Sequence, residues 1–268
     1  MDAVLYDVAL TAYIVAAVAA VGSLFGRRDQ LQRFTLLVTQ LGWVCHTAAL
    51  AARGIELGRW PFLTLAEAVS AVIWAVVLAD LWIGRRFRMP VLSAFVLPVV
   101  LALGLALPTG LRTLALGPQI QSGWVVVHVS LVLIGLAALV LNFGGALMYL
   151  FQEGQLKSKR HGAFYYRLPP LETLDRLTFV TLTVGFPFLT VGLVLGAVSA
   201  GRAWGRLFAF DPLALVSTVM WLVYATTLSF RVLGHWRGRR AAYFAIAGFC
   251  VLLLTLGAGV LLQGRHGS

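Results

Sequence analysis

The sequence contains few charged residues, and very few of these are acidic. Of its 268 residues only 12% are charged, ten are Asp or Glu, and 60% are hydrophobic. The mean hydropathy is +0.89. Soluble globular domains average about 25% charged and about 45–50% apolar residues. The composition therefore excludes a soluble globular domain and predicts a polytopic membrane protein, with one domain over residues 1–268.

Motifs for several classes of chemistry are also missing. The two cysteines, Cys45 and Cys250, form no CxxC pair, and we expect buried apolar roles for both rather than redox or metal roles. The sequence has no phosphate-binding glycine loop, zinc-type His/Cys spacing, G-x-S-x-G motif or carboxylate pair placed for acid–base catalysis. The sequence therefore contains no motif for these classes of chemistry.

Long apolar runs dominate what is present. Eight runs are long enough to cross about 30 Å of hydrocarbon, and each must be helical because lipid offers backbone polar groups no partners. The expected class is therefore all-α, with eight transmembrane helices. The expected spans are residues 3–25, 34–53, 63–83, 89–107, 123–151, 177–200, 212–231 and 241–263. Because no basic segment precedes the first run, we expect a retained helix rather than a removed signal peptide.

The basic residues predict the orientation. Fifteen of the 21 Lys and Arg residues lie in the loops after the first, third, fifth and seventh spans, and six lie on the other side. Cytoplasmic loops are enriched in Lys and Arg. Both termini are therefore predicted to lie outside a bacterial cytoplasmic membrane. The net charge of +11 is explained by this topology, so we expect the lipid bilayer and no nucleic acid as partner.

The stretch from Trp204 to Tyr224 is the strongest candidate for ligand binding. It combines a Trp-Gly turn, nearby arginines, alternating aromatics and an Asp-Pro pair that can start a helix: Trp204, Arg202, Arg206, Phe208, Phe210 and Asp211. Aromatic faces stack on flat ligands and guanidinium groups pair with carboxylates. This composition suits a flat, anionic, hydrophobic ligand. The alternative is an interfacial aromatic belt.

Three histidines are placed on the same outer side as this stretch. His128 follows Trp124 by one helical turn, His266 lies just beyond the last span, and His46 lies deeper in the second span. Two histidines could supply both axial nitrogens of a haem iron, and His128 with His266 is the pair we select. The alternatives are a packing histidine at 128 and a solvated one at 266. His46 could ligate a haem within the bilayer or bond to a neighbouring helix.

Other polar residues have structural interpretations. Thr64 and Glu67 have the spacing of a capping box, although Glu67 could instead accept from a histidine or pair with Arg59. Asp80 is expected to pair with Arg85 or Arg86. Residues 171–177 are either a short amphipathic helix on the inner surface or the first turns of the sixth span. Two glycine pairs, Gly144-Gly145 and Gly192/Gly196, predict close helix packing.

These segments resemble the cytochrome c assembly (CcsA-type) membrane proteins. Trp204-Gly205-x-x-Phe208-x-Phe210-Asp211-Pro212 is similar to the tryptophan-rich motif of that family. The segments around His128, His266 and His46 resemble those that carry its two external haem ligands and an intramembrane histidine. The sequence departs from the family where Phe208 and Phe210 replace tryptophans and where Ser229 replaces a second intramembrane histidine. The compact eight-helix form is most similar to the HemX-type branch.

The resemblance implies a protein that binds or transports haem, haem b, at the outer face. His128 and His266 would be axial ligands, the residues at 204, 208 and 210 a porphyrin platform, and Arg202 and Arg206 partners for the propionates. Such a chain would be at most the membrane part of a cytochrome c haem lyase, with an apocytochrome c or a separate assembly subunit as partner. The alternative is a membrane regulator or scaffold of haem biosynthesis, whose basic inner loops act on glutamyl-tRNA reductase levels.

Overall fold

A computed structural model describes residues 2–26, 28–105, 123–158, 165–204, 212–234 and 236–265, with the side chains of residues 2, 28, 65, 202–204, 212–213 and 255–265 excepted. These ranges form helices and no strand. The α-helices are α1 (Asp2–Gly22), α2 (Arg28–Leu57), α3 (Leu65–Arg86), α4 (Ser93–Leu105), α5 (Gly123–Ser158), α6 (Leu171–Trp204), α7 (Pro212–Val232) and α8 (Arg239–Arg265). Two short 3-10 helices are η1 (Pro90–Leu92) and η2 (Tyr165–Arg167).

The helices are those of a multi-pass membrane protein. Within the described ranges, six are long and apolar enough to cross a bilayer, namely α1, α2, α3, α5, α6 and α7. The apolar stretch Pro90–Leu105, which contains α4, is shorter. The predicted all-helical membrane class is confirmed. The eight predicted apolar segments overlap α1 to α8 in order, and eight transmembrane spans stay a prediction.

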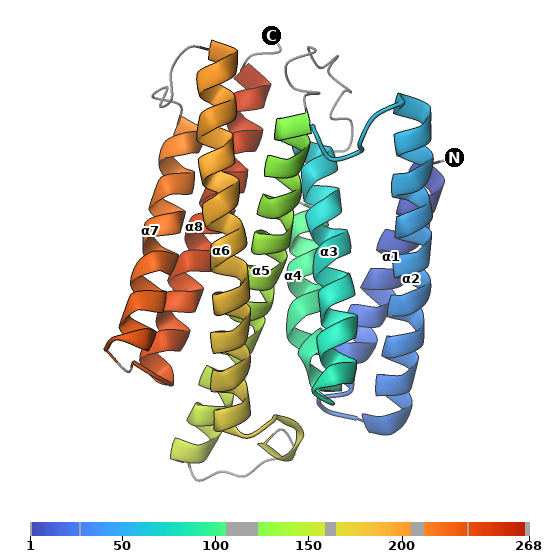
Figure 1. Ribbon diagram of the computed structural model, residues 1–268. Helices are drawn as coiled ribbons and strands as arrows, with labels where there is room; N and C mark the ends of the chain where they lie inside the picture. The colour runs from blue at the N-terminus through green and yellow to red at the C-terminus, as the bar shows by residue number, and fades with distance from the viewer. Residues whose placement is uncertain are drawn as a thin grey trace.

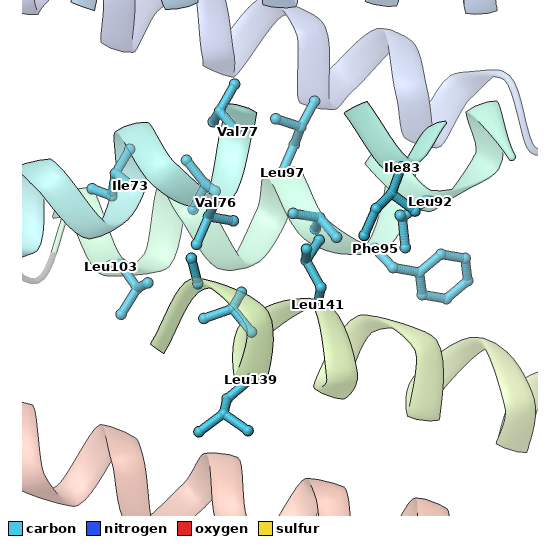
Figure 2. Close-up of a cluster of buried hydrophobic side chains, with 14 of the residues drawn as sticks. Ile73, Val76, Val77, Ile83, Leu92, Phe95, Leu97, Leu103, Leu139 and Leu141 are labelled. Atoms are coloured by element: carbon cyan, nitrogen blue, oxygen red, sulfur yellow. The ribbon is translucent and has the colours of Figure 1, made fainter. Parts of the chain in front are cut away.

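Successive helices run in opposite directions, so each end of the bundle collects alternate helix ends (Figure 1). We call the end at which α1, α3, α5 and α7 begin the upper end, as drawn. Helix α5 is central: it packs most extensively on α6 and also contacts α3, α4 and α8, while α1 packs on α2 and α4. The buried core lies where α3, α4 and α5 meet (Figure 2), and includes Val76, Leu97 and Leu139, all 0% exposed.

Glycines explain the close packing of α5 on α6. A Cβ atom at Gly185 would lie 2.9 Å from the Cβ of Ala138, and one at Gly135 would lie 3.0 Å from the backbone nitrogen of Leu189. At Gly145 it would lie 3.0 Å from Cγ2 of Thr178. Small residues let backbones approach in this way, and dispersion then holds the helices together. The expected close packing at Gly144-Gly145 is confirmed.

The start of α3 confirms the predicted capping box. The backbone N–H of Glu67 donates to Oγ1 of Thr64 at 3.3 Å, and the backbone N–H of Thr64 donates to Oε2 of Glu67 at 3.2 Å. Glu67 also accepts two hydrogen bonds from the Arg59 guanidinium, at 2.8 and 3.0 Å. The same carboxylate therefore caps the helix and neutralises Arg59, because its two oxygens can accept several donors.

Two expectations about single residues are corrected by the structure, and one open alternative is settled. Asp80 does not pair with Arg85 or Arg86; it is buried and accepts a 2.6 Å hydrogen bond from Oγ of Ser93. Of the two alternatives for residues 171–177, the structure has the first turns of α6. The cysteine at position 250 is exposed on α8 rather than buried.

A buried ion pair ties α6 to α7 at the lower end. Nη2 of Arg231 lies 3.0 Å from Oδ1 of Asp175, and these side chains are 4% and 21% exposed. Nη1 of Arg231 donates to Oγ1 of Thr178 at 3.0 Å. The backbone N–H of Gly238, a residue with φ +68°, donates to Oδ1 of Asp175 at 2.9 Å. One carboxylate thus fixes the α6, α7 and α8 ends relative to one another.

Candidate functional site

His128 lies in the second turn of α5, at the upper end of the bundle, and faces α6. Its Nδ1 lies 2.6 Å from the backbone oxygen of Gly192. Since a carbonyl only accepts, Nδ1 must carry the proton and donate it. The helix pair therefore fixes both the orientation of the ring and its tautomer.

The bare face of Gly196 makes room for the His128 ring. A Cβ atom at Gly196 would lie 2.7 Å from Cε1 and 3.0 Å from Nδ1 of His128. At Gly192, one turn earlier, a Cβ atom would lie 2.7 Å from Cγ2 of Val132. The expected packing role of the Gly192/Gly196 pair is thus confirmed, and the pair also forms a seat for an imidazole.

This arrangement leaves Nε2 of His128 as a lone-pair donor. No hydrogen bond to Nε2 is formed by the residues that the structure describes. Histidines that bind metals commonly donate their other ring N–H to a carbonyl or carboxylate, which orients the ring and makes the free nitrogen more basic. The hydrogen bond from Nδ1 therefore orients the His128 ring, and its Nε2 is free to act as an axial ligand.

Trp124 begins the same helix, one turn before His128. It is 52% exposed. An aromatic side chain at this height can cover a flat ligand or lie in the interfacial belt, and its exposure is compatible with either role.

His46 has a different environment from His128. Its side chain is 0% exposed, and both ring nitrogens have hydroxyl partners: Nδ1 lies 3.3 Å from the Tyr13 hydroxyl on α1 and Nε2 lies 2.9 Å from Oγ of Ser70 on α3. The predicted alternative, in which His46 bonds to a neighbouring helix, is therefore found, and His46 bonds to both α1 and α3. Haem ligation by His46 stays a prediction, and it requires one of these bonds to break.

The remaining predicted site residues lie outside the described side chains. These are His266, Arg202, Trp204, Arg206, Phe208, Phe210 and Asp211. The backbone nevertheless places their neighbours: α6 ends at Trp204, α7 begins at Pro212 and α8 ends at Arg265. These three helix ends and the start of α5 lie at the upper end of the bundle (Figure 1). The predicted helix start at Asp-Pro is confirmed.

Two features of the site were not predicted from the sequence. The acceptor for His128 is a backbone carbonyl, which carries no residue signature, although the glycine pair at 192 and 196 marks its position. The partners of His46, Tyr13 and Ser70, come from helices whose contacts depend on tertiary packing.

Comparisons with known proteins agree in pointing to one family. A family model described as cytochrome C assembly protein matches residues 62–266. The chain is similar to cytochrome c biogenesis proteins CcsA of Prochlorococcus marinus strain NATL2A (34% identity; 82% of this chain and 80% of the relative) and Synechococcus sp. strain RCC307 (32%; 96% and 92%). A CcsA protein of Guillardia theta is 30% identical over 85% of this chain and 83% of the relative.

Proposed function

Because the chain belongs to the cytochrome c assembly protein family, we propose that it handles haem for cytochrome c assembly and presents it at the outer face of a membrane. Haem is the cargo in this proposal rather than a permanent cofactor. The relatives named above are called cytochrome c biogenesis proteins, which supports the assembly role. Haem b, which is not yet attached to protein, is the form that such a role requires.

The observation that carries the proposal is the geometry of His128. Its Nδ1–H is committed to the Gly192 carbonyl at 2.6 Å, so Nε2 is the nitrogen available to iron. A neutral imidazole whose other ring nitrogen is hydrogen-bonded is a good axial ligand for haem. Bound haem would supply an iron that accepts a nitrogen ligand on each face. We propose His266, which follows the end of α8, as the second ligand.

The chain between α6 and α7 would hold the rest of the porphyrin. We propose that Trp204, Phe208 and Phe210, with Trp124 of α5, cover the ring. Arg202 and Arg206 would pair with the propionates, because guanidinium groups bind carboxylates in a bidentate manner. Asp211 would start α7 and so fix where this segment ends.

The proposed topology places this site outside a bacterial cytoplasmic membrane. Eight spans with both termini outside would put the upper end of the bundle on the outer side. The lower end carries Arg85, Arg86, Arg231, Arg239 and Arg240, as expected for a cytoplasmic face.

The chain's own contribution would be binding and orientation. Attachment of haem to an apocytochrome c needs reduced cysteine thiols, and these would come from the apocytochrome or from a separate assembly subunit. We therefore propose a haem-holding subunit that is not a catalyst alone.

A regulatory role on glutamyl-tRNA reductase stays a prediction that no described contact favours. Arg167, in the basic segment that would meet such an enzyme, donates to the backbone oxygens of Ser23 and Gly26 at 2.6 and 3.1 Å. The Arg167 guanidinium therefore binds the backbone that follows α1 within the same chain.

The proposal is tested by the absorption spectrum of the purified protein in detergent, oxidised and then reduced. We expect the wild type to give a low-spin haem spectrum and His128→Ala to lose it or become high-spin. His46→Gln separates the two predicted haem positions, since it removes the histidine within the bundle and should leave the low-spin spectrum of the outer site unchanged. A chain that takes up no haem, even after reconstitution, would contradict the proposal.

A further inference from the structure

A hollow lies between α2 and α3, away from His128. It has a volume of about 610 Å³ and is lined by Gln40, Trp43, Val44, Leu78, Leu81, Trp82, Arg85 and Arg86. We call it the α2/α3 groove. Its walls are mostly apolar. Trp82 is 63% exposed, and no aromatic ring among the described residues packs on it. The groove is therefore an open, largely apolar surface on the side of the bundle.

The lower end of the groove is cationic. Arg85 and Arg86 form the last turn of α3, and no ion pair to either is found in the described ranges. None of the eight lining residues is acidic. The nearest acid on α3, Asp80, is committed to Ser93 in the core. Positive charge thus lies at one end of the groove, and apolar surface fills its length.

We propose that this groove binds one anionic phospholipid. The phosphate would pair with Arg85 and Arg86, and an acyl chain would cover Val44 and Leu78. Haem is also an anionic amphiphile, but no histidine, cysteine or methionine lines the groove to ligate its iron. The basic lower end matches the leaflet whose anionic lipids attract arginines by about 1 kcal/mol each.

The test is native mass spectrometry of the full chain after exchange into detergent with equal amounts of phosphatidylglycerol and phosphatidylcholine of the same acyl chains. We expect the wild type to retain one phosphatidylglycerol in clear preference to phosphatidylcholine. The double variant R85Q/R86Q should reduce that preference about 10- to 30-fold, because it removes two arginines that each attract anionic lipid by about 1 kcal/mol.

The matched control is R239Q/R240Q, which removes two adjacent arginines from the same end of the bundle at α8. It should change retention less than about twofold, because a general surface effect of charge is small and screened. Circular dichroism of each variant verifies the fold. Equal losses in the two double variants, equal retention of both lipids, or a haem mass that disappears with R85Q/R86Q would each overturn the proposal. None of these outcomes depends on His128.

Discussion

Gly196→Ala is expected to reduce haem binding at the outer face at least tenfold without unfolding the protein. The new Cβ atom would lie 2.7 Å from Cε1 of His128, closer than carbon atoms approach one another in proteins. The imidazole must therefore move, and the 2.6 Å bond from Nδ1 to the Gly192 oxygen is lost with it. Displacement of about 1 Å is enough to spoil a ligand geometry. Haem content per chain, measured by absorbance, gives the result.

Gly154→Ala provides the matched control for this substitution. It makes the same change in the same helix as His128, but nothing lies within 4 Å of the added carbon. Alanine is favoured over glycine in a helix by about 1 kcal/mol, so the control should bind haem normally and be slightly more stable. If Gly196→Ala and Gly154→Ala bind haem equally well, the seat formed by Gly192 and Gly196 does not determine binding.

Asp175→Ala is expected to lower the free energy of unfolding by about 3–5 kcal/mol, more than the other substitutions proposed for this chain. The substitution leaves the Arg231 guanidinium buried without its carboxylate and leaves the Gly238 N–H without an acceptor. An uncompensated buried charge costs more than the pair itself contributes. The free energy of unfolding, measured by titration with SDS from mild detergent, should fall by this amount, with thermal unfolding in detergent as a second measure.

Lys157→Ala removes a cation from a surface pair for comparison. Nζ of Lys157 lies 2.7 Å from Oε1 of Glu153, but the lysine side chain is 60% exposed. Exposed pairs of this kind contribute about 0.2–1 kcal/mol. A loss for Asp175→Ala as small as that for Lys157→Ala would mean that water reaches Arg231 and that the lower ends of α6 and α7 are held by other contacts.

Local patterns in the sequence predicted much of the fold. Apolar length and the need to satisfy the backbone within lipid place all eight helices. The Thr64 and Glu67 spacing predicts a cap that depends only on neighbours in the chain, and the structure contains it. The prolines and glycines at helix ends and contacts were also informative. These features are local, so a single sequence is enough to infer them.

Contacts between distant helices could not be predicted in the same way. Apolar faces of membrane helices look alike whether they meet lipid or another helix. The sequence therefore placed Asp80 near Arg85, whereas packing of α3 on α4 gives it Ser93. It gave two options for His46 and could not name Tyr13 or Ser70. For His128 it identified the residue but not the Gly192 carbonyl that selects its free nitrogen.

Direct ligation of haem iron by His128 is the central claim, and rescue by free imidazole tests it most directly. His128→Gly removes the side chain from its seat beside Gly196 and leaves space for the isolated ring. We expect this variant to lack the low-spin haem spectrum, and we expect added imidazole to restore it in a saturable manner. If His128→Gly gives the wild-type low-spin spectrum without imidazole, the iron is held by other residues and the proposed role of His128 is wrong.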